Sequence, residues 1–431
     1  MHWVLGGYIW LYIHRPFEVW PSLGALQIER VYMLFALLYW VCYPGKTVVL
    51  NRLHAAFIAF ALALVMCWLS SPYAAEGTKT VEDFFKVVVF YVLVVTTVRD
   101  EKTLRKLVLI YLAVVGLYMA HSLVEFVHGR HVYRMGIRRM VGVDSTYNDP
   151  NTFSATLLYS LPLTLPFWAE RPRGWMKAAL WGYLGLSVVC ILLTGSRGAL
   201  VGLGCLTALW LGSAKRRGKL VMLLVLAVPV GWSLLPEQLH NRFRTLVDSS
   251  AGPANAQQSA EGRTKGLLDG LRLWGRSPAT GFGPNSFGKA AGHGFQAHSL
   301  YGQTLGEMGT LGLLTLAGMV ACFALNAAEA RRFGRDHPEE GVFLRNLSRA
   351  VSVAVVLLLV MGFGSHNLYR YTWLWFGAFQ GIALYCLRER ARVLALAGRG
   401  GHGEVPGWTG LPAGAGRPAL AGGWDTDLRP V

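Results

Sequence analysis

The sequence predicts an all-α protein that crosses a membrane many times, and three observations lead to this prediction. Hydrophobic residues make up 53% of the 431 residues and charged residues only 15%, against about 25% charged in an ordinary globular protein. Apolar runs suited to crossing a bilayer as helices recur along the chain. Lysine and arginine gather in alternate connections between these runs, which is typical of multi-pass membrane proteins.

We predict about twelve spans, several of them shorter than the usual ~20 residues. The first apolar run, residues 3–13, continues into His14, Arg15 and Pro16 without a small-residue cleavage pattern, which predicts a retained helix rather than a signal peptide. The predicted spans are residues 2–13, 32–43, 47–69, 84–98, 104–127, 151–168, 176–194, 198–212, 219–236, 299–326, 348–364 and 371–387.

One connection is much longer than the others. Residues 237–298, between the ninth and tenth spans, form a polar segment of about sixty residues, which is long enough to suggest a function of its own. Residues 388–431 turn to Arg, Gly and Pro, so we predict a disordered tail there. The chain is therefore expected to comprise a membrane domain, residues 1–387, which includes the long segment, and a tail, residues 388–431.

The positions of the basic residues predict the orientation of the chain. If the N-terminus is cytoplasmic, every even-numbered connection lies inside, and every one of them is basic. Both termini are then cytoplasmic, and residues 237–298 lie outside. The same rule accounts for most of the net charge of +17, so a nucleic-acid role is not indicated. The inner basic residues are Arg99, Lys102, Arg105, Lys106, Arg171, Arg173, Lys177, Lys215, Arg216, Arg217, Lys219, Arg331, Arg332, Arg335, Arg388, Arg390 and Arg392.

Two connections on the predicted outer side, residues 128–150 and 237–298, also carry several arginines. Positive charge is disfavoured on the translocated side, and arginine binds phosphate oxygens through two hydrogen bonds, so these residues suggest an anionic ligand. The alternative is that long loops are translocated regardless of their charge. The basic residues concerned are Arg130, Arg134, Arg138, Arg139, Arg242, Arg244, Arg263, Lys265, Arg272, Arg276 and Lys289.

Two polar motifs lie at predicted outer ends of spans. Arg197 stands between two spans that are joined by almost no loop, where an arginine is costly unless it reaches the interface or binds a ligand. Residues 262–276 predict an amphipathic helix on the outer surface, followed by a tight turn over residues 277–287. The apolar residues of this helix are Leu267, Leu268, Leu271 and Trp274.

A third motif, His298-Ser299-Leu300-Tyr301, stands where the chain re-enters the membrane. On the helix predicted to follow, Gly302, Gly306 and Gly309 form a ridge of small residues for close helix contact. Glu307 lies more than two turns inside this span, where an ionisable group is a functional candidate. A lone histidine at a helix start is more often structural than catalytic, so the interpretation depends on the neighbouring motifs.

Taken in order, these motifs resemble those of the O-antigen ligase and polymerase superfamily over residues 145–315. Each motif is short and degenerate, and their order and common outer placement make the resemblance specific. The resemblance implies a GT-C-like membrane protein of the bacterial inner membrane, with its long loop and active site in the periplasm. The matching segments are Asn148-Asp149-Pro150-Asn151-Thr152-Phe153, Ser196-Arg197-Gly198-Ala199, Gly262-Arg263 with Trp274, Gly281-Phe282-Gly283-Pro284-Asn285-Ser286-Phe287, and His298-Ser299-Leu300-Tyr301 with Glu307-Met308-Gly309.

In this superfamily, a glycan is transferred from undecaprenyl pyrophosphate to a sugar hydroxyl, such as one of lipid A-core. The resemblance implies that Arg197 and Arg263 bind the pyrophosphate and that His298 activates the hydroxyl. Two arginines can neutralise a leaving pyrophosphate, and histidine can accept a proton at neutral pH. We therefore expect an inverting transferase that uses neither metal nor cofactor. The secondary candidates are Tyr301, Glu307, Arg242, Arg276, Arg139 and Asp149.

The sequence leaves several activities open. Ligation to lipid A-core stands first, while a capsular or exopolysaccharide polymerase and a protein O-oligosaccharyltransferase share the same motifs. An anion transporter is the alternative of another class, although the two halves of the chain show no repeat and few charges lie inside the spans. Four acidic residues on the predicted outer loops also leave a metal ion possible: Asp144, Asp149, Glu261 and Asp269.

Overall fold

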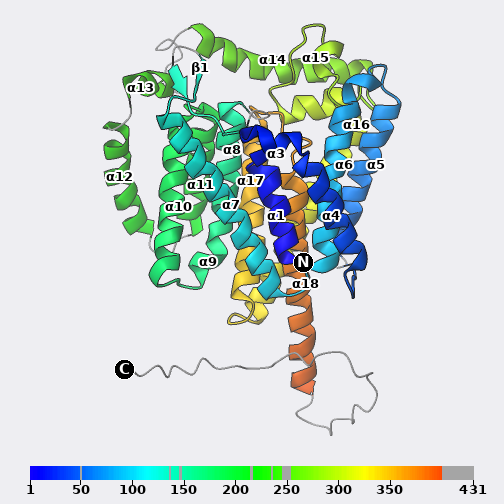
Figure 1. Ribbon diagram of the computed structural model, residues 1–431, viewed down its shortest axis with the longest axis vertical. Coiled ribbons are helices and arrows are strands. Elements are labelled where there is room, and N and C mark those ends of the chain that lie inside the picture. The colour runs from blue at the N-terminus through cyan, green and yellow to red at the C-terminus, as the bar shows by residue number, and fades with distance from the viewer. Residues whose placement is uncertain are drawn as a thin grey trace. The chain divides into compact units, whose positions relative to one another are not determined.

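The structure is a computed structural model that describes residues 1–48, 51–134, 137–144, 148–213, 217–233, 236–244 and 254–399. The chain divides into two compact units, Met1–Glu389 and Arg390–Val431. In the first unit, helices run side by side and successive long helices alternate in direction (Figure 1). The helices of the described residues are α1 (His2–Ile13), α2 (Pro16–Val19), α3 (Pro21–Ala25), α4 (Ile28–Cys42), α5 (Arg52–Leu69), α6 (Ala74–Thr97), α7 (Glu101–Val127), α8 (Pro150–Ser160), η1 (Leu161–Thr164), α9 (Leu165–Ala169), α10 (Gly174–Leu193), α11 (Arg197–Ser213), α12 (Arg217–Ser233), α13 (Glu237–Arg244), α14 (Ala254–Arg276), α15 (Phe287–Ala290), α16 (Leu300–Asp336), α17 (Val342–Gly362) and α18 (Thr372–Arg399).

The protein is a mostly α-helical membrane protein, as the sequence predicts. Among the described residues, five helices are long and apolar enough to cross a membrane: α5, α7, α10, α16 and α17. The other predicted spans also fall on helical segments, and α11 is apolar but shorter. The full twelve-span topology and the side on which each connection lies stay predictions.

A small β-hairpin departs from the all-helical expectation. Strands β1 (Val132–Arg134) and β2 (Ile137–Arg139) pair antiparallel, with Val132 opposite Arg139. Each strand has only three residues. Alternation of apolar and polar residues over so short a stretch cannot be recognised in the sequence. It buries Ile137 and Arg139 on one face, so an arginine enters the protein interior here.

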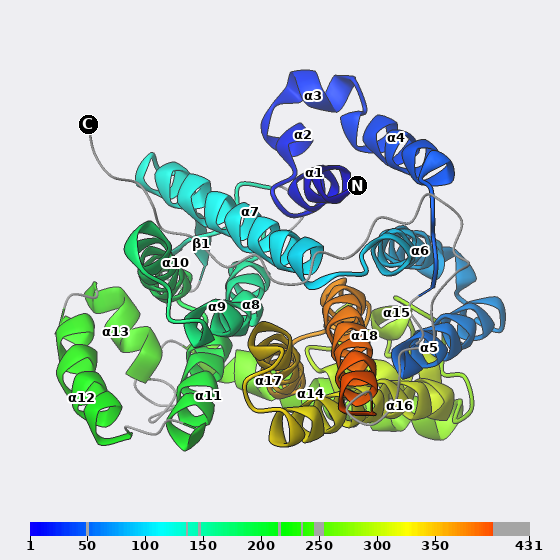
Figure 2. The same ribbon diagram turned by 90° about the horizontal axis from the view of Figure 1, so that it is seen from below.

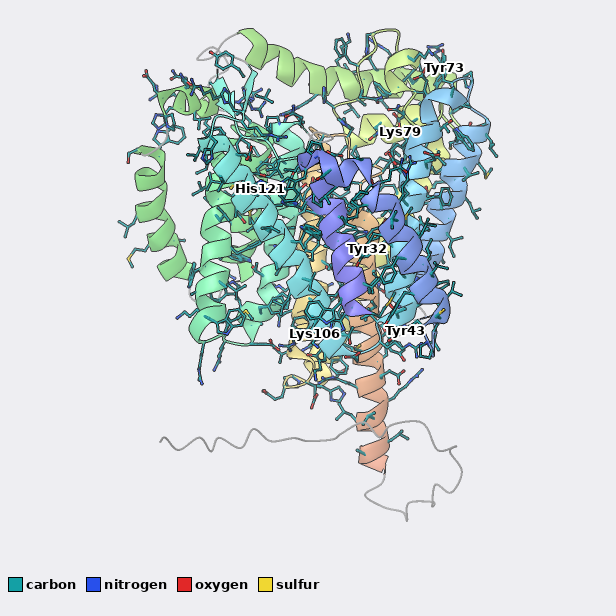
Figure 3. All side chains as sticks on the ribbon, in the orientation of Figure 1. Tyr32, Tyr43, Tyr73, Lys79, Lys106 and His121 are labelled. Atoms are coloured by element: carbon teal, nitrogen blue, oxygen red, sulfur yellow. The ribbon has the colours of Figure 1, made fainter. Side chains whose placement is uncertain are left out.

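The connections gather at two opposite ends of the first unit. β1, α13, α14 and α15 lie together at one end, which we call the α14 end (Figure 1). Tyr73 and Lys79 also lie toward the α14 end, whereas Lys106 lies toward the opposite end (Figure 3). Viewed along the helices, α12 lies at the edge of the unit beside α11 (Figure 2). The long polar segment and the basic connection around Lys106 are therefore at different ends.

The described residues of the long polar segment, 237–244 and 254–298, form three helices instead of an open loop. The predicted amphipathic helix is present as part of α14, and its residues Leu268, Leu271 and Trp274 are 48%, 43% and 38% exposed. Glycines form the opposite face, where a Cβ atom on Gly270 would lie 2.5 Å from the Cα of Gly302 in α16. The two backbones thus approach more closely than any side chain would allow.

The helix α16 is longer than the predicted span and contains a break at Gly309. This residue has φ 60° and ψ −150°, a conformation that only glycine adopts readily. The turn that precedes α15 forms hydrogen bonds with the backbone groups that lose their helical partners at this break. The irregular backbone is thus buried in protein, as is required inside a membrane protein. Phe282 and Gly283 N–H groups donate to the carbonyls of Gly306 and Glu307 at 2.9 Å, and Thr310 and Leu311 N–H groups donate to those of Pro278 (2.8 Å) and Ala279 (3.1 Å).

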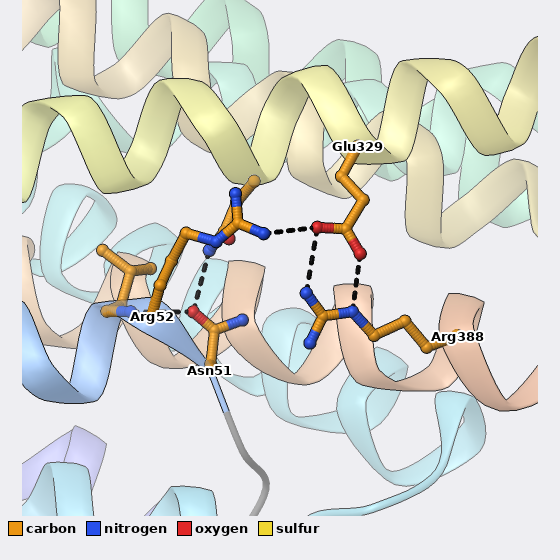
Figure 4. A network of polar contacts seen from close by, with 6 residues as sticks. Asn51, Arg52, Glu329 and Arg388 are labelled. Atoms are coloured by element: carbon orange, nitrogen blue, oxygen red, sulfur yellow. Dashed lines mark hydrogen bonds and ion pairs between the residues drawn. The ribbon is translucent and has the colours of Figure 1, made fainter.

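An ion-pair network joins three helices, α5, α16 and α18 (Figure 4). Glu329 of α16 accepts hydrogen bonds from Arg52 of α5 at 2.7 Å and from both Nε (2.6 Å) and Nη2 (2.9 Å) of Arg388 in α18. Beside it, Asn326 donates to the N-cap residue Asn51 at 2.9 Å. The bidentate contact fixes the direction of Arg388, while Arg52 makes a single hydrogen bond.

Replacing Glu329 with glutamine is expected to destabilise the protein by about 1 kcal/mol, because two guanidinium groups lose a shared anion that is only partly screened by solvent. Thermal unfolding in detergent measures this change. The control is Glu76→Gln, which breaks a more exposed pair with Lys289 and should have almost no effect. Equal midpoints for Glu329→Gln and the wild type would contradict the stabilising role.

Candidate functional site

A cavity of about 960 Å³ at the α14 end brings together the three principal residues predicted from the sequence. Arg197 begins α11, Arg263 lies on α14, and His298 directly precedes Ser299, the N-cap of α16. All three line this cavity, although one hundred residues separate the first from the last. Arg139, Asp149 and Arg242, three of the secondary candidates, line the same cavity.

Two arginines hold the turn that presents Arg197. The chain leaves α10, turns at Gly195 with φ 58°, and enters α11 at Arg197, which is 6% exposed. Arg139 Nε donates to the carbonyl of Thr194 at 2.7 Å, and Arg242 Nε donates to the carbonyl of Gly195. A Cβ atom on Gly195 would meet the Arg242 side chain at 3.3 Å. Arg139 and Arg242 therefore position the turn from two different elements.

Arg263 lies partly buried against the segment between α17 and α18. Its Nε would be 2.9 Å from a Cβ atom on Gly364. Burial, and then the positive charge of Arg197, lowers the pKa of Arg263, although a guanidinium still keeps its proton in a protein. No carboxylate of the described residues forms an ion pair with Arg263. Arg197 and Arg263 thus bring two positive charges close together, which favours a bound anion.

The charge of the cavity is strongly positive. Asp149 caps α8 by accepting from Thr152 N–H at 2.8 Å, and Asp269 accepts from Arg272 at 2.9 Å. These are the two carboxylates among the described lining residues, so the basic side chains outnumber them and the cavity suits a ligand carrying several negative charges. Among the described residues, the basic side chains that line the cavity are Arg139, Arg197, Arg242, Arg263, Lys265 and Arg370.

Among the described residues, three histidines line the cavity, and their environments differ. The N–H of Phe295 donates to His293 Nδ1 at 3.1 Å, so Nε2 carries the proton and donates to Asp269 at 3.2 Å. Both nitrogens of His293 are thus engaged in holding the loop. His298 faces His366, with the two ring centroids 5.8 Å apart. The geometry therefore gives His293 a structural role in the loop and places His298 beside His366 in the cavity wall.

Three other sequence candidates do not line the cavity. The Tyr301 hydroxyl donates to the carbonyl of Leu359 at 3.0 Å. Glu307 is fully buried and accepts hydrogen bonds from Tyr369 (2.8 Å) and Gln303 (3.2 Å). Arg276 stacks on the ring of Phe282 at 5.1 Å. Each makes contacts within the protein that hold α16 and its surroundings together.

Sequence reasoning missed a further part of the cavity wall, the segment between α17 and α18. Ser365, His366, Asn367 and Arg370 all line the cavity. Residues 366–369 read His-Asn-Leu-Tyr and repeat the His-x-Leu-Tyr pattern of residues 298–301. This repeated pattern is the signal that could have found them.

The comparison with known protein families agrees with this geometry. Residues 182–317 match the family described as O-antigen ligase, and this stretch contains Arg197, Arg263 and His298. No curated protein matches the chain. The match over residues 182–317 supports membership of this chain in the O-antigen ligase superfamily.

Proposed function

We propose that this protein transfers a glycan from undecaprenyl pyrophosphate to a hydroxyl group of lipid A-core at the periplasmic face of the bacterial inner membrane. The family match supports glycan transfer of the O-antigen ligase or polymerase type. The single observation that carries the finer proposal is the meeting of Arg197, Arg263 and His298 in one strongly basic cavity. Its excess of cations suits a pyrophosphate better than a neutral sugar alone.

Arg197 and Arg263 bind the donor pyrophosphate in this mechanism. As the bond between the anomeric carbon and the pyrophosphate oxygen breaks, its electron pair leaves with the lipid pyrophosphate. Negative charge therefore grows on the leaving oxygen, and two guanidinium groups fixed beforehand stabilise that charge in the transition state. Arg139 and Arg242 act as positioning residues, because they hold the turn in front of Arg197.

His298 accepts the proton of the acceptor hydroxyl. The acceptor oxygen forms the new bond to the anomeric carbon from the side opposite the leaving pyrophosphate, so the configuration at that carbon inverts. The proton ends on the imidazole, and one pyrophosphate-linked lipid is released for each glycan transferred. A neutral imidazole is suited to this step near pH 7.

Transfer by the purified protein in vesicles tests the proposal, with undecaprenyl pyrophosphate-linked glycan as donor and rough lipopolysaccharide as acceptor. We expect Arg263→Ala to lower the rate about 100-fold or more, as loss of one charge-stabilising donor does in other enzymes. The matched control is Arg276→Ala, because Arg276 lies on the same helix outside the cavity. A chelator should leave the wild-type rate unchanged.

The same assay separates the other candidate functions. Elongation of the lipid-linked glycan without attachment to lipopolysaccharide would assign a polymerase, and attachment to a protein would assign an O-oligosaccharyltransferase. If wild-type protein consumes no donor with any acceptor, the transferase proposal fails and anion transport becomes the better interpretation. Equal rates for Arg263→Ala and Arg276→Ala would show that the proposed pyrophosphate site is wrong.

A further inference from the structure

A second, smaller cavity of about 320 Å³ adjoins the basic cavity. The two cavities share four lining residues: Thr152, Gln296, His366 and Arg370. Beyond this shared wall, the smaller cavity extends between α1, α6, α7 and α16. The arginines of the proposed pyrophosphate site do not line it. The smaller cavity therefore lies across the shared wall from the proposed pyrophosphate site.

The lining of the smaller cavity differs in chemistry from that of the basic cavity. Its described lining residues include one guanidinium, from Arg370, and one carboxylate, from Asp83, so formal charge is balanced apart from His366. Aromatic rings next to amide groups suit a sugar, which presents apolar C–H faces and hydroxyls that both donate and accept hydrogen bonds. The rings and amides belong to Tyr12, Tyr118, Tyr369, Tyr371, Asn285, Gln296 and Gln303.

Gln303 gives independent support for a polar ligand in this cavity. The side chain is only 5% exposed, and its Nε2 donates to the Glu307 carboxylate at 3.2 Å. Tyr369 donates to the same carboxylate at 2.8 Å. This arrangement fixes the amide with Oε1 as an acceptor, and Oε1 is buried without a hydrogen-bond partner among the described residues. A buried acceptor of this kind is costly unless a ligand or water satisfies it.

Arg370 supplies the complementary group on the shared wall. Its Nη2 donates to Thr156 and to the carbonyl of Thr152, and its guanidinium stacks on the ring of Tyr159. Its Nε is buried and has no acceptor among the described residues. Two residues that line the cavity, Gln303 and Arg370, thus each carry a buried polar atom without a partner among the described residues, one an acceptor and the other a donor. Sugar hydroxyls both donate and accept, whereas an ionised phosphate only accepts, so this pair suits a sugar better than a phosphate.

We propose that the smaller cavity binds the acceptor sugar and presents its hydroxyl at the shared wall, next to the His298 and His366 pair. This assignment rests on the proposed function. Inverting transfer requires the hydroxyl to approach opposite the leaving pyrophosphate, and the smaller cavity lies across the wall from the arginines. The 5.8 Å separation of the two histidine rings places His298 close to that wall. Gln303 and Arg370 orient the sugar by hydrogen bonds.

Filling the smaller cavity tests this proposal. Thr80 on α6 lines the cavity, whereas Thr78 on the same helix is exposed and does not. Thr80→Trp is expected to raise the KM for rough lipopolysaccharide at least tenfold while leaving the KM for the lipid-linked donor within about twofold. Thr78→Trp, the matched control, should leave both constants unchanged.

A second variant removes the unsatisfied acceptor without filling the cavity. Gln303→Leu is expected to raise the KM for rough lipopolysaccharide about tenfold, the factor that corresponds to one lost hydrogen bond in a buried site. Thermal unfolding of each variant in detergent shows that the protein is folded. The donor KM again serves as the internal comparison, because the donor is held by arginines that neither variant touches.

The outcomes separate this proposal from the function on which it rests. If the wild type transfers glycan and Thr80→Trp matches Thr78→Trp, the acceptor assignment is wrong and the proposed function stands. A rise confined to the donor KM also overturns it, because the cavity then holds a sugar of the donor. If the wild type consumes no donor at all, the proposed function itself fails.

Discussion

Replacing His298 with alanine should lower the rate of glycan transfer by about 10²- to 10⁴-fold, the usual contribution of a general base. The loss should appear in kcat, because His298 removes a proton in the reacting state and is not needed to bind the pyrophosphate. Initial rates at saturating donor and acceptor measure it. Binding of the lipid-linked donor to the variant should remain close to that of the wild type.

His293 provides the matched control for this experiment, since it lines the same cavity but has both ring nitrogens engaged. His293→Gln, which keeps a donor for Asp269, should retain most of the activity. If the two variants lose activity equally, the base has been misassigned. A His298→Ala protein that transfers as fast as the wild type would likewise exclude a proton-accepting role for this residue.

The second large effect is expected at Gly309, far from the reacting groups. A side chain at φ 60° and ψ −150° costs about 1–3 kcal/mol by itself. Its Cβ atom would also lie 2.7 Å from the Ala279 carbonyl oxygen and 2.8 Å from the Gly281 nitrogen. Gly309→Ala must therefore displace the turn that satisfies the broken helix, and we expect the thermal unfolding midpoint in detergent to fall by several degrees.

Gly318 lies on the same helix and supplies the control. A Cβ atom there would meet nothing within 4 Å, and the backbone is helical. Gly318→Ala should leave the midpoint unchanged or raise it, because alanine favours a helix by up to about 1 kcal/mol over glycine. Similar midpoints for both variants would mean that the break at Gly309 contributes little to stability.

The sequence predicts those features that depend on short stretches of chain. Apolar runs locate the helices, and a few motifs identify Arg197, Arg263 and His298, which line one cavity. The packing of α14 against α16 could not be predicted from such short stretches. Leu268 and Leu271 look like a hydrophobic stripe in the sequence, yet they are exposed, while Gly266 and Gly270 face α16 together with Leu273. The decisive factor is how closely two backbones from distant parts of the sequence can approach.

The roles of Arg139 and Arg242 depend on tertiary structure in the same way. Both are arginines of connections predicted to lie outside and suggest anion binding from sequence, while the structure shows each donating to a carbonyl of the turn before Arg197. Every residue has a backbone carbonyl, so the sequence does not indicate which carbonyl an arginine will bind. His366 and Arg370 were missed because they stand in a short connection between two apolar spans.

The glycine contact between α14 and α16 has a consequence for how the site tolerates change. A Cβ atom on Gly266 would lie 3.2 Å from the backbone nitrogen of His298, and one on Gly302 would lie 2.2 Å from the Gly266 carbonyl oxygen. The spacing between Arg263 and His298 is therefore set by main chain against main chain, with no side chain that could adjust its rotamer. This contact therefore holds the two helices at a fixed distance. Different substrates must then be accommodated by parts of the cavity wall away from the contact between α14 and α16. Inhibitors that push these two helices apart would disable phosphate binding and proton transfer at the same time.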